Sequence, residues 1–228
     1  MHTIEAQRRE EIVYFGRMLH QYGFVAATDG NLSARLPDGS IVATPTSISK
    51  GMMRPEDLVV VDPEGHRLSG CRNVSSEIGM HLLIYRMRPD VNGIVHAHPP
   101  TATGFAAAGL PLDQPIVCEV ILSLGAVPVA RYATPGSPGL AESLVPLVPD
   151  YDAVLMANHG VVTYGETLLK AYMNMEIVEH FAKIVLVTQQ LGKQQPLSRL
   201  ELDRLVAVRA SYEGHTSQAS MPPRKEVS

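Results

Sequence analysis

Tryptophan is absent from this sequence of 228 residues, and four phenylalanines and eight tyrosines are its only large aromatic side chains. A hydrophobic core must therefore rely on aliphatic residues, and these are plentiful, because 45% of the chain is hydrophobic. No apolar run approaches the ~20 residues of a membrane-spanning helix. Residues 1–9 are polar and charged, unlike a secretion signal. We expect a soluble, cytoplasmic protein.

Cysteine and basic clusters are also scarce. The two cysteines, Cys71 and Cys118, stand in unrelated contexts, which excludes a disulfide framework and a Cys-x-x-Cys metal site. The net charge is −4 and basic residues form no block, which argues against a surface for nucleic acids or anionic membranes. The glycine motifs that cradle nucleotide phosphates are missing as well. The sequence therefore gives no indication of a nucleic-acid, membrane or nucleotide partner.

Helical and extended segments alternate along the chain, as apolar spacing, capping residues and turn residues indicate. No repeat or linker interrupts them, so we predict one domain over residues 1–213 and a disordered polar tail over 214–228. The alternation of helical and extended segments predicts a three-layer α/β/α sandwich. Helices are expected at residues 5–21, 75–88, 101–108, 140–147, 166–190 and 197–212, and strands within 28–35 and at 41–43, 58–61, 66–68, 93–97, 127–132, 154–156 and 161–163.

Three histidines form the most informative pattern. His96 and His98 lie at the end of the expected strand 93–97, where alternate side chains point to the same face and can share a metal ion. His159 follows another short apolar run and can supply a third nitrogen. Three neutral nitrogen ligands with one open position are typical of catalytic zinc. Each histidine by itself could equally be a hydrogen-bonded core residue.

Three short segments have the composition of anion-binding loops. Residues 28–33 and 44–47 offer a glycine or small side-chain donors beside exposed main-chain NH groups, and residues 75–76 precede an expected helix, whose dipole favours an anion. Ordinary turns use the same residues, but three such segments beside a histidine set indicate a phosphate site. Glu77 follows directly, as an acid/base group or as an exposed residue favoured by the helix dipole. His81 shares its helix face, and we interpret it as a packing or supporting residue.

The chain resembles the class II aldolase and adducin family, especially its fuculose-phosphate aldolases. The resemblance covers residues 5–212 in the expected order. It implies an α/β/α sandwich around a mainly antiparallel sheet, and a homotetramer with four-fold symmetry whose active site lies between subunits. The motifs that carry the resemblance are Gly30-Asn31-Leu32-Ser33, Thr44-Pro45-Thr46, Ser75-Ser76-Glu77, His96-x-His98, Tyr132-Ala133-Thr134-Pro135-Gly136 and Asn158-His159-Gly160.

The resemblance implies a role for each matching residue. One zinc ion per chain is held by His96, His98 and His159, and Glu77 is the acid/base group beside it. Tyr212 resembles the C-terminal tyrosine that family members lend to a neighbouring subunit. The substrate phosphate is implied to contact Gly30, Asn31, Thr46, Ser47, Ser75 and Ser76.

Two residues depart from the fuculose-phosphate aldolase pattern. Ser47 stands in place of a glycine in the phosphate loop, and Glu119 stands where those aldolases have a protonating tyrosine, which leaves the aldehyde half of the substrate open. The resemblance thus predicts a zinc-dependent aldolase that cleaves a ketose 1-phosphate, such as fuculose, 5-deoxyribulose or methylthioribulose 1-phosphate, into dihydroxyacetone phosphate and an aldehyde. A sugar-phosphate 4-epimerase or a decarboxylase of a phosphorylated keto acid remains an alternative on the same metal site. A non-enzymatic module like adducin is disfavoured by the complete histidine set.

Overall fold

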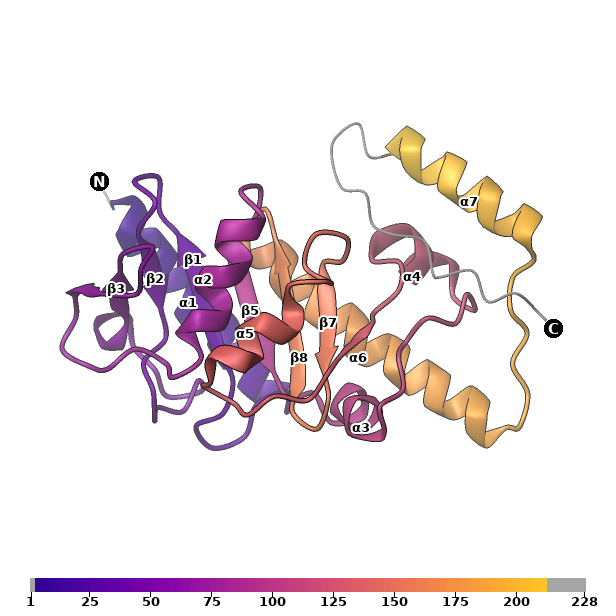
Figure 1. Cartoon of the computed structure of the whole chain (residues 1–228), viewed down its shortest axis with the longest axis horizontal. Helices are drawn as coiled ribbons and strands as arrows, with labels where there is room; N and C mark the ends of the chain where they lie inside the picture. Colours follow the sequence, from indigo (N-terminus) through magenta and orange to yellow (C-terminus); the bar gives the residue numbers. More distant parts are fainter. Residues whose placement is uncertain (1–2, 213–228) are drawn as a thin grey trace.

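The computed structural model describes residues 3–212, without the side chains at positions 206 and 209–212. Its centre is an eight-stranded sheet with the strand order β4-β3-β2-β1-β5-β8-β7-β6 (Figure 1). Neighbouring strands are antiparallel except for the parallel pair β6 and β7. The strands are β1 (Asn31–Arg35), β2 (Ile41–Ala43), β3 (Val59–Val61), β4 (Arg67–Ser69), β5 (Gly93–Ala97), β6 (Val129–Ala130), β7 (Ala153–Met156) and β8 (Gly160–Gly165).

Helices cover both faces of this sheet (Figure 1). Helices α1, α3 and α6 pack on one face and α2 and α5 on the other, while α7 packs against α4. This arrangement confirms the predicted α/β/α sandwich; the predicted tail over 214–228 lies outside the described residues. The helices are α1 (Ile4–Gln21), α2 (Ile78–Met87), α3 (Pro100–Ala108), α4 (Cys118–Ser123), α5 (Pro138–Leu144), α6 (Leu168–Gln190) and α7 (Arg199–Tyr212), with a 3₁₀ turn η1 at Pro55–Asp57.

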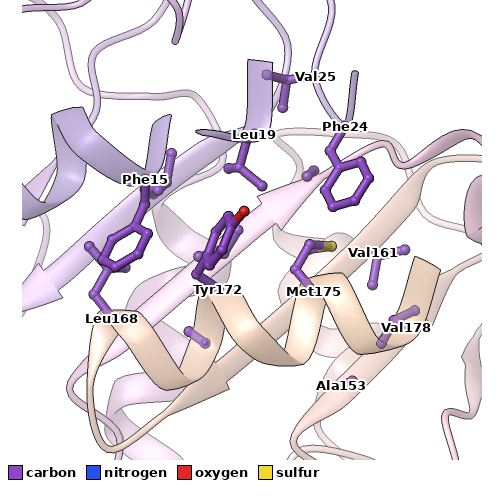
Figure 2. Close-up of a cluster of buried hydrophobic side chains, with 14 of the residues drawn as sticks. Phe15, Leu19, Phe24, Val25, Ala153, Val161, Leu168, Tyr172, Met175 and Val178 are labelled. Carbon is purple, nitrogen blue, oxygen red and sulfur yellow. The ribbon is translucent and has the colours of Figure 1, made fainter. Parts of the chain in front are cut away.

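The first core lies between the sheet and helices α1, α3 and α6. Phe15 of α1 stacks on Tyr172 of α6 with ring centroids 4.9 Å apart, and Leu19 and Met175 fill the space beside them (Figure 2). Burial of an aliphatic or aromatic side chain of this size contributes about 1.5–3 kcal/mol. The layer therefore holds the two long helices firmly on the strands that carry the histidines.

The second core lies under α2 and α5, and strand alternation separates it from the first. On β5, Val95 belongs to the first core and Ile94 to the second, so His96 faces the side of α2. On β1, Leu32 belongs to the first core, so the intervening Asn31 faces α2 as well. Strands β5 and β1 thus direct His96 and Asn31 towards the buried layer under α2, where these polar side chains need hydrogen-bond partners.

Three elements differ from the sequence-based expectations. Helix α2 begins at Ile78 rather than at 75–76, because a turn closed by the Ile78 N–H to the Ser75 carbonyl at 3.1 Å precedes it. Within the expected strand 127–132, only Val129–Ala130 joins the sheet, and Val127 forms an isolated antiparallel bridge with Leu112. Helix α4 was not predicted, since its six residues are too few to show helical periodicity. None of the described helices is long and apolar enough to span a membrane.

Candidate active site

The site lies where β5 ends and its two neighbours, β1 and β8, begin. Antiparallel pairing places Asn31 of β1 opposite His96, and His96 opposite Val162 of β8. His98 directly follows β5, and His159 lies in the turn between β7 and β8. Residues that are far apart in the sequence therefore meet at one edge of the central strands, as predicted for the three histidines.

The three imidazoles turn one nitrogen each towards a common point. The nearest approach joins the Nε2 atoms of His96 and His98, 3.1 Å apart, and ring centroids of the set are 4.7–5.3 Å apart. His96 donates its Nδ1 proton to the Val161 carbonyl at 2.8 Å, and His98 donates its Nδ1 proton to the Asp29 carboxylate at 2.9 Å. With its proton on Nδ1, each of these rings can present the lone pair of Nε2 to a metal ion.

This donor set fits a divalent metal ion. The candidate ligand nitrogens of His96, His98 and His159 all lie within 4.8 Å of one another, and a tetrahedral ion with bonds of 2.0–2.1 Å separates its ligand atoms by about 3.3 Å. Burial and repulsion from His96 lower the pKa of His98 to about 4, so its imidazole is neutral, as a ligand must be. The contact between Asp29 and His98 is the carboxylate–histidine pair that commonly orients metal ligands.

Glu77 lies against the histidine set, at the N-cap of α2. Its two carboxylate oxygens are each 3.2 Å from a histidine Nε2, one on His96 and the other on His159. Its side chain is only 10% exposed, which excludes the reading of a solvent-exposed helix residue. Burial raises the pKa of the Glu77 carboxyl, but in the metal-free site the hydrogen bonds and charge that protonated His159 and His96 supply outweigh it and hold the pKa well below its usual range.

The turn that carries His159 needs the residues on either side of it. Asn158 has φ +56°, a left-handed conformation that asparagine tolerates better than most residues. A Cβ atom at Gly160 would lie 2.4 Å from Cδ2 of His98 and 2.7 Å from the Ala97 carbonyl oxygen. Only glycine lets β8 begin this close to the His98 ring, which explains the motif Asn-His-Gly.

Gly160→Ala is therefore expected to displace His98 and to lower metal affinity by about 10- to 100-fold, the usual range for a disturbed metal-ligand environment. Gly104→Ala is the matched control, because a Cβ there meets nothing within 4 Å and alanine favours a helix interior by about 0.5–1 kcal/mol. Titration of each metal-free variant with Zn²⁺ measures the difference. Equal affinities in the two variants would contradict this account.

The predicted anion loops are joined by main-chain hydrogen bonds. Thr44 N–H donates to the Leu32 carbonyl at 3.0 Å, and Ser75 N–H donates to the Thr44 carbonyl at 3.1 Å. Thr46 N–H donates to the Asn73 carbonyl at 3.0 Å. The segments around residues 31, 46 and 75 are therefore neighbours in space, although 44 residues separate the first from the last in the sequence.

Two glycines allow the close packing of these loops. Gly30 has φ +71°, and a Cβ there would lie 2.5 Å from Val25 and 2.9 Å from the His96 carbonyl oxygen. Gly136 has φ +74° and lies against Ser76, where a Cβ would come within 3.4 Å of the Ser76 carbonyl oxygen. The segment that contains Gly136 is thus placed beside the predicted phosphate loops.

Lys50 is a site-supporting residue that sequence reasoning missed. It is 1% exposed, and its ammonium donates at 2.7 Å to the carbonyls of both Thr28 and Ile48. It thereby joins the loop of Asp29, which orients His98, to the loop that follows Thr46. Burial lowers the pKa of Lys50 to about 8, against the opposing attraction of Asp29. A single lysine between loop residues carries no sequence signal that distinguishes it from a surface lysine.

The geometry agrees with comparisons against known proteins. The family model described as "Class II Aldolase and Adducin N-terminal domain" matches residues 10–186. The chain belongs to the class II aldolase and adducin family. A solved structure of an L-fuculose 1-phosphate aldolase superimposes with a TM-score of 0.83 at 32% identity and covers 91% of this chain and 97% of that one.

Two curated class II aldolase relatives carry different activities. The 5-deoxy-D-ribulose 1-phosphate aldolase of Bacillus thuringiensis is 33% identical over 93% of this chain and 98% of that protein. The 3-oxo-tetronate 4-phosphate decarboxylase of Escherichia coli K12 is 36% identical over 81% of this chain and 88% of that protein. Both are lyases of one family, and the chain is accordingly an enzyme of this class.

Ser47, which stands where the resemblance to fuculose-phosphate aldolases implies a glycine, has φ +58°. A left-handed conformation costs a residue with a side chain about 1–2 kcal/mol. We therefore expect Ser47→Gly to relieve the backbone strain at this position and to raise the affinity of the loop for inorganic phosphate. Ser47→Ala keeps the strain and should not raise that affinity. Calorimetric titration of both variants with phosphate checks this, and a tighter site in the alanine variant would argue against it.

For the two remaining predicted site residues, Glu119 and Tyr212, the described part of the chain shows no contact with the histidine set. Glu119 is exposed in the first turn of α4, and no contact with the histidine set is found among the described residues. Tyr212 is the last residue of α7, and its side chain lies outside the described part of the chain. Both stay predictions that depend on a neighbouring subunit.

Proposed function

We propose that this protein is a metal-dependent aldolase that cleaves a ketose 1-phosphate into dihydroxyacetone phosphate and an aldehyde. The observation that carries the proposal is the convergence of three histidine nitrogens, two of which lie 3.2 Å from the Glu77 carboxylate, beside loops that can hold a phosphate. The 5-deoxy-D-ribulose 1-phosphate aldolase relative supports it, because the similarity extends over nearly the full length of both proteins.

Retro-aldol cleavage sets the chemical demands on these residues. The C3–C4 bond breaks, its electron pair becomes an enediolate beside the C2 carbonyl, and the C4 hydroxyl loses its proton as the aldehyde leaves. A bound divalent ion supplies a Lewis acid for the developing negative charge. Because His96, His98 and His159 are neutral, they leave that charge undiminished. Glu77, at 3.2 Å from two of them, is placed to return a proton to C3.

The phosphate group provides binding energy away from the reacting carbons. Asn31, Thr46, Ser75 and Ser76 offer polar side chains to the phosphate, and Gly30 and Ser47 offer their main chain. Fixing one end of the substrate in this way holds C3 and C4 near the histidine set and lowers the entropic part of the barrier. A sugar without phosphate is therefore a poor substrate.

A decarboxylase is the second candidate, favoured by relatives of 36% identity named 3-oxo-tetronate 4-phosphate decarboxylase. Loss of carbon dioxide from C2 of a 3-oxo-4-phosphotetronate leaves the enediolate of dihydroxyacetone phosphate. The aldolase reaction passes through the same species, and the two differ in the leaving group. A departing carboxylate is already ionised, so this reaction needs no base to remove a hydroxyl proton.

The assembly and the ion belong to the same proposal. Three imidazole ligands favour zinc, one ion per chain. A homotetramer in the cytoplasm, with Tyr212 and Glu119 beside a neighbouring subunit's histidine set, would complete the aldehyde end of the site. Light scattering at micromolar concentration then reports about four chains, and a fully active monomer would remove the shared site from the proposal.

A product assay tests the function directly. Zinc-loaded enzyme is incubated with a panel of ketose 1-phosphates and with 3-oxo-tetronate 4-phosphate, and dihydroxyacetone phosphate, aldehyde and carbon dioxide are each measured. Aldehyde formed in equal amount with dihydroxyacetone phosphate supports the aldolase. Carbon dioxide from the keto acid alone supports the decarboxylase, and no turnover of any phosphorylated substrate overturns both.

A further inference from the structure

A ladder of five buried polar side chains joins strand β1 to helix α2. Glu77, His81 and Tyr85 recur every four residues on one face of α2, and Asn31 and Ser33 alternate on the facing side of β1. Four helical residues rise about 6 Å and two strand residues about 6.8 Å, so the two series stay in step. We call these five residues the polar ladder.

Each rung of the polar ladder is a short hydrogen bond. The Asn31 Nδ2 group donates to Glu77 at 2.8 Å, and the Asn31 Oδ1 atom lies 2.6 Å from Nε2 of His81. The Ser33 hydroxyl lies 2.6 Å from Nδ1 of His81 and 2.9 Å from the Tyr85 hydroxyl. The ladder thus runs without a gap from Glu77 to Tyr85.

The donors in this ladder can be assigned from its ends. The Glu77 carboxylate only accepts, so Asn31 must turn its NH₂ group towards it and its carbonyl towards His81. His81 must then carry its proton on Nε2, and its bare Nδ1 accepts from the Ser33 hydroxyl, which accepts from Tyr85 in turn. Burial and repulsion from His96 lower the pKa of His81 to about 3, which keeps the ring neutral.

The ladder holds groups in place and does not conduct protons. A hydroxyl or an imidazole can accept a proton on one side and release one on the other. The Asn31 amide cannot do so without becoming an imidic acid, so it interrupts any transfer between His81 and Glu77. The hydrogen bonds of the ladder instead fix the orientation of its side chains. The His81 tautomer determines which end of the Asn31 amide faces Glu77.

We propose that His81 is a positioning residue, which locks the Asn31 amide so that it donates to Glu77 and aims that carboxylate at the histidine set. The effect on turnover rests on the proposed function, whereas the tautomer and the amide orientation do not. Among the described residues His81 makes no recorded hydrogen bond to the histidine set, and its two bonds go to Asn31 and Ser33 of β1. Its loss should therefore lower kcat and leave the metal content unchanged.

The first test compares His81→Phe with His81→Gln. Phenylalanine fills similar space but removes both rungs at this position, and kcat is expected to fall about 10- to 100-fold, as for other residues that orient a metal site. Glutamine can donate to Asn31 and accept from Ser33, so it should restore most of kcat. Zinc content stays unchanged in both variants, which distinguishes His81 from the three candidate metal ligands. A wild-type kcat in His81→Phe overturns the inference.

A second pair of variants guards against misfolding. Tyr85→Phe removes the outer hydroxyl of the ladder, and Tyr164→Phe removes an equally buried hydroxyl that has no hydrogen-bond partner among the described residues. Both tyrosines lie in the second core. Tyr85→Phe should lower kcat, though less than His81→Phe, and Tyr164→Phe should leave it unchanged. Equal kcat values for the two tyrosine variants contradict the ladder.

A spectroscopic measurement on the wild-type chain is independent of activity. In metal-free protein labelled with ¹⁵N-histidine, the ring resonances absent from His81→Gln belong to His81. We expect a neutral ring with a slowly exchanging proton on Nε2. A proton on Nδ1 would reverse the Asn31 amide and overturn the proposal. Absence of turnover in the wild type, with this tautomer present, would refute the proposed function and leave the ladder standing.

Discussion

Alanine at any one of His96, His98 or His159 should remove the metal ion and turnover together. Two imidazoles hold a divalent ion far less tightly than three, and loss of the Lewis acid forfeits several kcal/mol of transition-state stabilisation, or about 10³-fold or more in rate. Elemental analysis of the purified variants gives ions per chain, and dihydroxyacetone phosphate release gives turnover. The metal-replete wild type should hold about one ion per chain.

His66→Ala is the matched control for this series. Its side chain is 80% exposed and its ring contacts Asp62, so the variant should keep both metal and turnover. A full complement of metal in all three site variants would show that the histidines are no more than hydrogen-bonded core residues. Full turnover in a variant that has lost its metal would show that the reaction does not require the ion.

Glu77→Gln should keep the fold and the ion and lose about 10²- to 10⁴-fold in turnover, the usual contribution of general acid–base catalysis. The amide has the same size, and its oxygen can still accept from Asn31, but it cannot accept and return a proton. Single-turnover kinetics measure the loss. Thermal unfolding and elemental analysis check that fold and metal are retained.

Asp152→Asn controls for the loss of a buried carboxylate at the opposite end of α2. Asp152 pairs at 3.0 Å with Arg88, the C-cap residue of that helix. Its substitution should lower the melting temperature and leave turnover near that of the wild type. If Glu77→Gln, like Asp152→Asn, lowers the melting temperature but keeps near-wild-type turnover, Glu77 stabilises the helix and takes no part in the reaction.

The strands and the metal set were predictable because their signals are local. The short apolar runs at 41–43 and 93–97 became β2 and β5 with the predicted bounds. Alternation along a strand, together with the motif Asn158-His159-Gly160, was enough to predict that three histidines meet. Asn158 and Gly160 are required by the backbone conformation and close packing of the turn. The motif in the sequence therefore indicates the turn directly.

The supporting residues were not predictable because their roles depend on pairing between distant segments. Asp29 orients His98 only because β1 lies beside β5, and Lys50 looks like a surface residue until two loops close over it. His81 was placed correctly on the face of Glu77, but its partner Ser33 comes from β1. That partnership requires the register between a strand and a helix, which hydrophobic periodicity does not specify.

The order of the strands in the sheet has a consequence for biosynthesis. Strand β5 pairs with β1, which the ribosome releases earlier, and with β8, which it releases much later. A nascent chain that ends before His159 presents His96 and His98 alone, so it can hold an ion by two of the three nitrogens at most. Binding of an ion by all three histidines therefore cannot precede the synthesis of His159, and its free energy stabilises only a chain that contains both β5 and the turn before β8. A chain truncated ahead of His159 lacks one of the three nitrogens and gains no such stabilisation from a metal ion.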